Sequence, residues 1–557
     1  MSEVSAEQRP WLKNYPSGVP ANIDPDKYES VVNMLEESFE KYKKLPNFSC
    51  MGKTLTYGEI DKMSQQFGAY LQSRGLKKGD KVALMMPNLL QYPIALFGAV
   101  RAGLVVVNTN PLYTPREMEH QFVDSNTKAI VILENFAFNL QKIIDKTEIE
   151  VVITTSIGEL LPTVKGMITN FVVRKVKNMV PKFDIPNTVS FKDALAGGKK
   201  FKLQKHTIAR EDVAILQYTG GTTGRAKGAM LTHRNLISNM MQIGAIMNPF
   251  VEESKEVILC PLPMYHIFAL TVNVFAPINK GFHGILIVNP RELKTIVSAF
   301  KDYPISMMTG VNTLYNALLN FKPFAELDLS GMKIAAAGGT ALQRPVAEKW
   351  QQVTGTSISE GYGMTESSPV ATSNPYDGSG RVGTIGIPVP STDVRIVDEQ
   401  GSALGPNQVG EIQIKGPQVM KGYYNRPQAT ADTIKDGWLS TGDIGEMSDD
   451  GFFKIVDRKK DMILVSGFNV YPNEVEEVVA GHPKVMEAAA IGIPSEKSGE
   501  AVKIFVVKKD KSLSKDELIS YCRENMTGYK VPKAVEFRDE LPKSTVGKIL
   551  RKDLRES

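Results

Sequence analysis

The sequence predicts an α/β protein with a large, multi-lobed N-terminal domain of mostly parallel sheets and a small α+β C-terminal domain. At 557 residues the chain is too long for one ordinary hydrophobic core, so it should divide into several lobes. Short apolar runs alternate with stretches of helical spacing, which is typical of parallel sheets covered by helices. Charge then concentrates abruptly at 454–461, and this change in composition indicates a domain boundary.

The alternation is clearest in the first part of the chain. Residues 30–39 and 54–76 carry apolar side chains at helical spacing, whereas four apolar runs have the length of buried strands: 81–86, 103–108, 129–133 and 150–154. Beyond the charged boundary, two further runs predict strands and one stretch predicts a helix: 488–493, 502–507 and 515–525. We therefore expect an N-terminal domain over 1–457 and a C-terminal domain over 458–557.

Composition narrows the class of protein. With 42% hydrophobic and 23% charged residues the chain should fold as a soluble protein, and a net charge of +5 is too small to indicate nucleic-acid binding. Three widely spaced cysteines and six unclustered histidines argue against a disulfide framework and a dedicated zinc site. No apolar leader is present, and no apolar run reaches the ~20 residues that span a bilayer. We therefore expect a cytoplasmic protein.

Residues 165–182 allow two interpretations. On a helix, seven apolar side chains share one broad face: Met167, Ile168, Phe171, Val172, Val176, Met179 and Val180. Arg174 and Lys177 lie mostly off that face. The pattern predicts either an ordinary surface helix packed on the core or a basic amphipathic helix that rests on a membrane. Packing on the core is the commoner arrangement, and we expect it here.

The most informative motif is the loop at 218–228, which follows the apolar run 213–217. Its glycines let the backbone turn tightly and bring N–H groups close to a ligand, its threonines add hydroxyl donors, and Lys227 adds a positive charge. That chemistry suits a polyphosphate. The spacing differs from the Gly-x4-Gly-Lys-Ser/Thr phosphate loop, because Lys227 stands between Ala226 and Gly228. The alternative is a flexible Gly/Thr surface loop.

Two clusters suit the walls of a pocket. His266 lies within 261–269 among bulky apolar residues that could face an apolar ligand, although a lone histidine is usually structural. Residues 335–341 form a strand followed by a glycine turn, where backbone can approach a flat ligand closely. The alternative for the second cluster is a simple tight turn.

Three clusters carry groups that suit a nucleotide. Residues 361–366 place an aromatic ring, a hydroxyl and a carboxylate within one turn, and a carboxylate together with phosphate oxygens is the usual way to hold Mg²⁺. Asp443 follows Ser-Thr-Gly and suits either ribose hydroxyls or an Asx turn. Lys548 follows a glycine near the C-terminus, where a lysine is ordinarily a surface charge.

In their order along the chain, these motifs resemble those of the adenylate-forming superfamily, which includes acyl-CoA synthetases, peptide-synthetase adenylation domains and luciferases. The resemblance spans nearly the whole chain. Within the superfamily, residues 436–443 and 450–461 are similar to the signature of fatty acyl-CoA synthetases, with further similarity at 85–95 and 465–474.

The resemblance implies the adenylate-forming enzyme fold and a reaction that uses a fatty acid, ATP, Mg²⁺ and CoA. A fatty carboxylate attacks the α-phosphate of ATP, which releases pyrophosphate and leaves an acyl-adenylate. The thiol of CoA then attacks the carbonyl and expels AMP. The small C-terminal domain is expected to rotate between the two steps. Peripheral contact with the inner face of a membrane and a homodimer are further expectations.

The resemblance also implies roles for individual residues. Those expected to bind ATP are Thr219, Gly220, Gly221, Thr222, Thr223, Gly224, Lys227, Gly338, Gly339, Thr340, Tyr362, Gly363, Thr365, Asp443, Arg458 and Lys548. Thr219 and Glu366 would help to bind Mg²⁺, and these two residues with Lys548 and His266 form the expected catalytic set. Lys460 would be the hinge, and Ser466, Gly467 and Phe468 would line the CoA side.

Two positions depart from the superfamily's pattern. Asp457 stands where many relatives carry glycine, although the fatty-acid branch commonly has aspartate. Leu270 aligns with a tryptophan that gates the fatty-acid tunnel of one relative. Two alternatives to a fatty acyl-CoA synthetase are an enzyme that activates an aryl acid and a non-catalytic lipid-binding protein on the same fold. The second is disfavoured because Lys227, Glu366 and Lys548 are all present.

Overall fold

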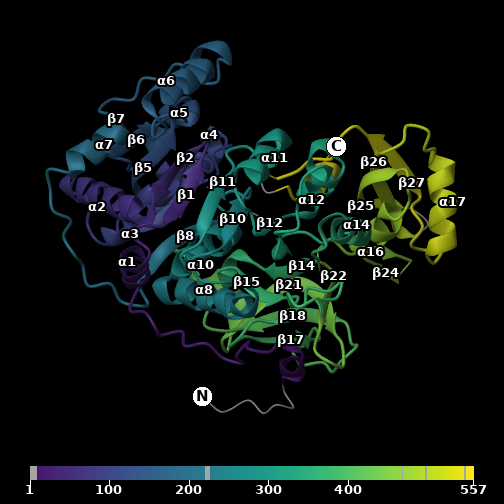
Figure 1. The fold of residues 1–557 in the computed structure, drawn as a ribbon. Helices are drawn as coiled ribbons and strands as arrows, with labels where there is room; N and C mark the ends of the chain where they lie inside the picture. Colours follow the sequence, from purple (N-terminus) through teal and green to yellow (C-terminus); the bar gives the residue numbers. More distant parts are fainter. Residues whose placement is uncertain are drawn as a thin grey trace.

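The computed structural model describes residues 9–219, 226–458, 460–466, 468–495, 498–544 and 547–556. These residues form four sheets, three in the large N-terminal part and one in the C-terminal part. Figure 1 shows the C-terminal part, in yellow and yellow-green, at the opposite end of the molecule from the blue lobe that carries α2 and α5–α7.

An eight-stranded sheet has the order β19-β9-β8-β4-β3-β5-β6-β7. Its strands are β3 (Lys81–Met85), β4 (Val105–Asn108), β5 (Thr127–Leu133), β6 (Val151–Thr155), β7 (Val189–Ser190), β8 (Val213–Thr219), β9 (Lys227–Thr232) and β19 (Gly422–Tyr423). Strands β3 to β8 pair in parallel, whereas β9 and β19 are antiparallel. The helices of this lobe are α2 (Tyr57–Ser73), α3 (Gln91–Arg101), α4 (Pro115–Ser125), α5 (Glu134–Gln141), α6 (Thr163–Phe171) and α7 (Phe191–Gly198).

A nine-stranded sheet lies beside it, with the order β16-β15-β14-β13-β12-β10-β11-β1-β2. Its strands are β1 (Pro46–Cys50), β2 (Lys53–Thr56), β10 (Val257–Cys260), β11 (His283–Leu286), β12 (Met307–Gly310), β13 (Ile334–Ala337), β14 (Ile358–Gly363), β15 (Val370–Ser373) and β16 (Ile387–Pro388). The associated helices are α1 (Val31–Lys41), α8 (His233–Met247), α9 (Ile267–Ala269), α10 (Ala276–Asn279), α11 (Leu293–Asp302), α12 (Asn312–Leu319), α13 (Lys322–Ala325) and α14 (Arg344–Thr354). The central strands are parallel, as the sequence predicts.

The third sheet is antiparallel and lies below the other two in Figure 1. It contains β17 (Asp393–Val397), β18 (Gly410–Lys415), β20 (Ile434–Lys435), β21 (Trp438–Met447) and β22 (Phe453–Arg458), with α15 (Pro427–Thr433). Because β22 pairs with β21, the chain up to 458 belongs to this N-terminal sheet.

The C-terminal sheet has the order β24-β23-β26-β25, with β27 beside β26. Its elements are β23 (Ile463–Val465), β24 (Phe468–Val470), α16 (Pro472–Ala480), β25 (Val485–Ser495), β26 (Gly499–Lys508), α17 (Lys515–Asn525), β27 (Ala534–Arg538) and α18 (Arg551–Arg555). Strands β25 and β26 and helix α17 match the three elements expected after the charged boundary. The sheet has a hydrophobic cluster of its own.

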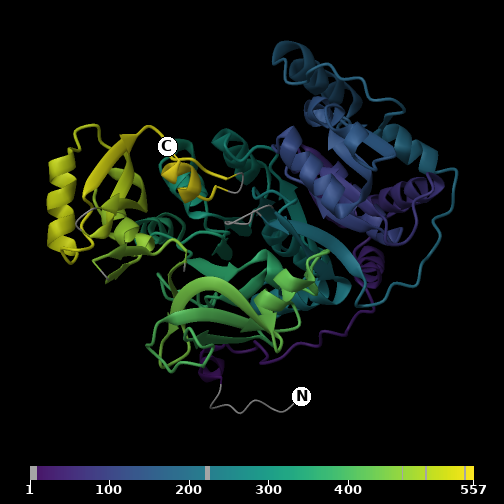
Figure 2. The same ribbon diagram turned by 180° about the vertical axis from the view of Figure 1, so that it is seen from behind.

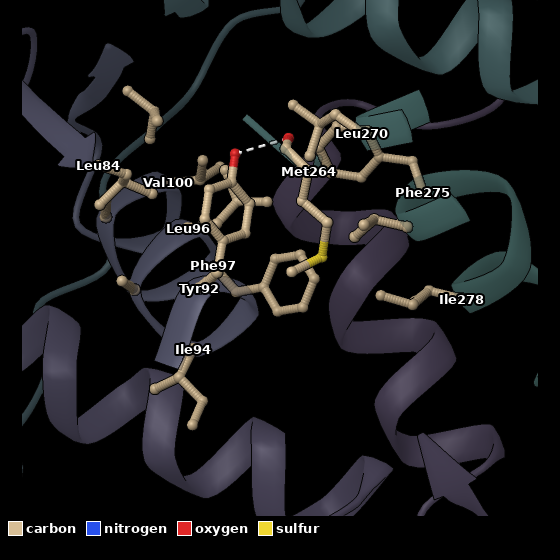
Figure 3. Close-up of a cluster of buried hydrophobic side chains, with 14 of the residues drawn as sticks. Leu84, Tyr92, Ile94, Leu96, Phe97, Val100, Met264, Leu270, Phe275 and Ile278 are labelled. Atoms are coloured by element: carbon tan, nitrogen blue, oxygen red, sulfur yellow. Dashed lines mark hydrogen bonds between the residues drawn. The ribbon is translucent and has the colours of Figure 1, made fainter. Parts of the chain in front are cut away.

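Helix α3 lies at the centre of the largest core. Its sequence is apolar on all sides, and every one of its residues is buried, as expected for a helix that is covered all round. Figure 3 shows Tyr92, Phe97 and their neighbours from α3 against Met264 and Leu270. Leu270, at the start of the π-helix η6 (Leu270–Phe275), is fully buried in this cluster.

A network of buried polar side chains joins the two large sheets. The Tyr92 hydroxyl donates to Asn108 Oδ1 at 2.7 Å and to the carbonyl of Met264 at 2.9 Å. Asn108 Nδ2 donates to Gln217 Oε1 at 2.9 Å, and Gln217 Nε2 donates to the carbonyl of Tyr265 at 3.0 Å. The carboxyl ends of β4 and β8 are therefore tied to the loop that follows β10.

The apolar face of 165–182 is exposed, so the expectation that it packs on the core is wrong. Within α6 and the π-helix η4 (Val172–Val176), the buried residues are Gly166 and Val173. Six large apolar side chains are 49–66% exposed: Val164, Met167, Ile168, Phe171, Val176 and Met179. Figures 1 and 2 both place α6 at the outer tip of its lobe. No helix in the described ranges is long and apolar enough to cross a membrane.

The three cysteines, Cys50, Cys260 and Cys522, are all buried and unpaired. Burial raises the pKa of the Cys50 thiol to about 12 and that of the Cys522 thiol to about 11, and it also raises the pKa of Cys260. The thiols are therefore packing groups.

Candidate functional site

The expected site residues gather where strands of both large sheets end. Thr219 is the last residue of β8, the turn at Gly338 follows β13, and Gly363 ends β14. His266 lies in the loop after β10. Because the carboxyl ends of parallel strands open onto a common crevice, this is where an α/β protein binds ligands. Five residues of the glycine-rich loop, Gly220, Gly221, Thr222, Thr223 and Gly224, lie outside the described residues.

Tyr423 joins two of the predicted residues. Its hydroxyl donates to Glu366 Oε1 at 2.7 Å, and the Lys227 ammonium lies 4.9 Å from the centre of its ring. Glu366 is 6% exposed, and its carbonyl accepts a hydrogen bond from the N–H of Met420. The Glu366 carboxylate therefore contacts the hydroxyl of Tyr423, and the Lys227 ammonium contacts its ring. No sequence motif marks Tyr423, because the pairing of β19 with β9 sets its position.

The backbone of the turn after β13 lacks side chains at Gly338 and Gly339, so a ligand can approach it closely. Gly339 has φ +81, which favours glycine, and a Cβ at Gly338 would come within 3.2 Å of the Phe268 ring. The hydroxyl of Thr340 is buried and has no hydrogen-bond partner within the described part of the chain. A buried hydroxyl without a partner is unfavourable, so this group fits a role in contacting a ligand.

The 361–366 motif is connected to the antiparallel sheet. The Tyr362 hydroxyl donates to Asp443 Oδ2 at 2.6 Å, and Asp443 is 5% exposed. A Cβ at Gly363 would collide with the carbonyl oxygen of Pro369, so only glycine fits there. Thr365 begins the short helix η7 (Thr365–Ser367), which carries Glu366.

Arg458 lies opposite Asp443 in the pairing of β21 with β22. The side chain of Arg458 lies outside the described part of the structure, so its expected grip on ribose stays a prediction. The backbone register alone brings the two positions together.

His266 is uncharged near neutral pH. Burial, together with the positive charge of Lys548, lowers its pKa to about 4. The N–H of Phe268 donates to His266 Nδ1 at 3.3 Å, so the proton of the neutral ring is on Nε2. His266 can therefore donate one hydrogen bond without adding charge to the site.

Lys548 of the C-terminal part lies close enough to His266 for its charge to act on that ring. Its loop packs on α12, where the Thr313 hydroxyl donates to the carbonyl of Gly547 at 3.3 Å. Within the loop, the N–H of Lys548 donates to the Ser544 hydroxyl at 3.1 Å. The structure therefore brings Lys548 to the strand ends of the N-terminal sheets.

The described residues expected on the CoA side contact other residues of the C-terminal part, not the strand ends of the N-terminal sheets. The N–H of Ser466 donates to the carbonyl of Ser498, and Phe468 is 56% exposed and stacks on Tyr529, so both make contacts within the C-terminal part. Gly467 lies outside the described residues. Lys460, the expected hinge, is exposed in the turn between β22 and β23.

Glu360 is a buried acid that the sequence does not single out. It lies on β14 directly before the 361–366 motif and is 7% exposed. Burial raises its pKa to about 8, against the effect of the hydrogen bond that the N–H of Leu342 donates at 3.2 Å, and Glu477 adds to the rise. Glu360 is therefore largely protonated at pH 7.

The donor set fits Mg²⁺ only with help from a substrate. In the described ranges, no three His, Cys, Asp or Glu side chains gather in a way that could hold a metal ion by themselves. Mg²⁺ is commonly held by one or two carboxylates together with phosphate oxygens, and Glu366 supplies such a carboxylate.

The sequence of the whole chain is similar to those of known proteins. The AMP-binding enzyme family model matches residues 35–424, and the model of the AMP-binding enzyme C-terminal domain matches 474–548. A long-chain-fatty-acid–CoA ligase from Escherichia coli O6:H1 is 55% identical over 547 residues, which cover 98% of each chain.

Solved structures show the same fold. The anthranilate CoA ligase AuaEII in complex with anthranoyl-AMP has a TM-score of 0.85 at 24% identity, over 96% of this chain and 98% of that one. ATP-bound MatB from Rhodopseudomonas palustris has a TM-score of 0.81 at 28% identity, over 94% and 98%. The fold predicted from the sequence is confirmed.

We expect Glu360→Gln to raise stability increasingly as pH rises. Between pH 4.5, the ordinary pKa, and about 8, the unfolded chain has lost the Glu360 proton while the folded chain keeps it, so stability falls as pH rises through this window. The cost reaches roughly 3 kcal/mol by pH 7. The midpoint of thermal unfolding of the variant should exceed that of the unchanged protein more at pH 8 than at pH 5.5.

The exposed Glu399→Gln provides a matched control and should leave the midpoint unchanged at both pH values. A Glu360→Gln effect that is the same at pH 5.5 and pH 8 would show that Glu360 does not hold its proton in the folded protein.

Proposed function

Since this chain belongs to the AMP-binding enzyme family, we propose that it is a long-chain-fatty-acid–CoA ligase that forms AMP. The 55% identity to the Escherichia coli ligase over 98% of both chains supports the long-chain fatty substrate. The acyl-CoA product would serve fatty-acid degradation and lipid synthesis. The structural observation that carries the proposal is Lys548, which the C-terminal part brings beside His266 at the strand ends.

In the first step, a carboxylate oxygen of the fatty acid attacks the α-phosphorus of ATP and the bond to the β-phosphate breaks, so pyrophosphate leaves. Two anions must meet, and the site must offset their repulsion by positioning and by fixed positive charge. Lys548 is proposed to bridge the carboxylate and the α-phosphate, and Lys227 to hold the β- and γ-phosphates. Neutral His266 would line the entry of the acyl chain.

The nucleotide would lie between the two sheets. The adenine would be framed by Gly338, Gly339, Thr340 and Tyr362. Thr365 would contact the α-phosphate. Asp443 and Arg458 would bind the ribose hydroxyls. This assignment requires the Tyr362–Asp443 hydrogen bond to open or to be shared when the ribose arrives.

Mg²⁺ is proposed to bind to Glu366, the Thr219 hydroxyl and phosphate oxygens. Bound there, the ion would neutralise phosphate charge as pyrophosphate leaves. Tyr423 orients the Glu366 carboxylate through its hydrogen bond. The orientation therefore exists before any nucleotide binds.

In the second step, the thiol of CoA attacks the carbonyl of the acyl-adenylate and AMP leaves. Ser466, Gly467 and Phe468 are proposed to line the path of the thiol. Rotation about Lys460 would carry Lys548 away and bring this face to the site, because a few residues at the end of an element can absorb the change in φ and ψ.

Contact with a membrane is proposed through α6 and η4. These two helices carry five exposed apolar side chains, Met179 just beyond η4 adds a sixth, and three exposed lysines lie near them in sequence: Lys175, Lys177 and Lys182. Arg174 is paired with Glu134 at 2.7 Å, whereas the three lysines form no ion pair with the described residues, so they are better candidates for binding anionic lipid. A location on the cytoplasmic face and a homodimer remain predictions.

We expect the protein to form acyl-CoA, AMP and pyrophosphate from ATP, Mg²⁺, CoA and long-chain fatty acids. Chromatography of the products with a panel of chain lengths measures this directly. Competition between oleate and coumarate separates this proposal from the activation of an aryl acid. The proposal is wrong if no chain length gives acyl-CoA, or if coumarate is used in preference to oleate.

We expect Lys548→Ala to lower the rate of acyl-adenylate formation by roughly 100-fold or more, because an electrostatic contact made in the transition state is lost. Thioester formation from supplied acyl-adenylate should be retained. The exposed Lys552→Ala is the control and should change neither half-reaction. Equal losses in both half-reactions of Lys548→Ala would contradict the proposed division of roles.

We expect the triple variant Lys175→Glu, Lys177→Glu and Lys182→Glu to sediment less with vesicles that contain anionic lipid, because it reverses charge beside the apolar face. The triple variant Lys509→Glu, Lys511→Glu and Lys515→Glu makes the same change of charge on the C-terminal domain and should sediment as the unchanged protein does. The α6 contact is refuted if both variants sediment equally.

A further inference from the structure

Arg551 forms a cluster of ion pairs around the proposed hinge. One guanidinium nitrogen lies 3.3 Å from Asp457 and 3.5 Å from Asp461, and another lies 2.8 Å from Glu476. Arg555 adds a 2.8 Å contact to Asp461. The side chain of Arg551 is 14% exposed, so these pairs are only weakly screened by solvent.

The partners of Arg551 lie on both sides of Lys460. Asp457 belongs to β22 and pairs with Ile444 of the N-terminal antiparallel sheet. Asp461 and Glu476 come after the hinge and belong to the C-terminal part. One arginine therefore bridges the two bodies that the hinge would separate.

The carboxylate of Asp457 makes two contacts with the C-terminal part. Its side chain is 0% exposed; one oxygen faces Arg551 and the other accepts a 2.8 Å hydrogen bond from the N–H of Asn473, at the start of α16. A buried carboxylate that loses its charged partner is costly. The contact therefore favours the arrangement in which the C-terminal part sits as the structure shows.

The same short segment carries Lys548 and Arg551. The N–H of Leu550 donates to the carbonyl of Pro542 at 2.9 Å, and Lys543 and Ile549 form an antiparallel bridge, so the segment is fixed on the body of the domain. The charge of Lys548 acts on the His266 ring, whereas Arg551 forms an ion pair with Asp457. Holding Arg551 in place thus holds Lys548 in place.

We propose that Arg551 is a positioning residue that latches the C-terminal domain in the arrangement for acyl-adenylate formation, through its ion pair with the buried Asp457. The latch must open before the second step, when Arg551 keeps Asp461 and Glu476 but leaves Asp457. The inference rests on the proposed function and adds to it a residue that sets which half-reaction the enzyme is ready to perform.

The test compares two variants of similar size and chemistry. Asp457→Asn removes the ion pair across the hinge but leaves an oxygen to accept the hydrogen bond from Asn473. Glu476→Gln removes an ion pair of Arg551 within the C-terminal part and can still accept the hydrogen bond that Ala490 donates. Both leave Arg551 with charged partners, so each is better suited to folding than Arg551→Ala.

Acyl-adenylate formation and thioester formation from supplied acyl-adenylate are measured separately for each variant. Asp457→Asn should slow the first by roughly tenfold or more and leave the second unchanged or faster. Glu476→Gln should leave the ratio of the two rates as it is in the unchanged protein.

The latch is refuted if Asp457→Asn leaves the ratio unchanged, or if Glu476→Gln shifts it as far. Either result would mean that the cluster only stabilises the fold. If the unchanged protein performs neither half-reaction, the proposed function fails instead, so the two failures are distinct.

Discussion

The geometry of the site depends on one buried amide, that of Asn108. It accepts a hydrogen bond from Tyr92 and donates one to Gln217, and each of these two side chains donates in turn to a carbonyl of the loop that precedes His266. In a low dielectric such a network is strong while complete and costly when broken. The end of β8 and the loop of the neighbouring sheet are therefore fixed relative to each other before any ligand binds.

Two buried titratable groups near the site, Glu360 and His266, are uncharged, and Lys227 supplies a positive charge. Glu360 keeps its carboxyl proton and His266 carries a proton on Nε2 alone, so neither side chain is charged near pH 7. Lys227 rests on the ring of Tyr423, a partner that attracts a cation without neutralising it. Lys227 can therefore present its full charge to a polyphosphate.

Much of the fold could be predicted because hydrophobic periodicity is a local property, and the strands over 81–85 and 127–133 follow the apolar runs 81–86 and 129–133 closely. Several of the site motifs directly follow apolar runs in the sequence, so their positions at strand ends could also be predicted locally. Tyr423 and Arg551 could not be found in this way, since their partners are distant in sequence and meet only through sheet pairing and domain packing. Periodicity located the apolar face of α6 but could not predict that this face stays exposed to solvent.

The burial of all three cysteines has a practical consequence for testing whether the C-terminal domain rotates as proposed. Disulfide exchange and alkylation proceed through the thiolate, and these thiols are both inaccessible and reluctant to ionise. None of the three native cysteines should therefore react with a thiol-directed label. A pair of cysteines placed on the exposed surfaces of α6 and α17 would accept fluorophores selectively, so that energy transfer could report rotation of the C-terminal domain without removing any native cysteine.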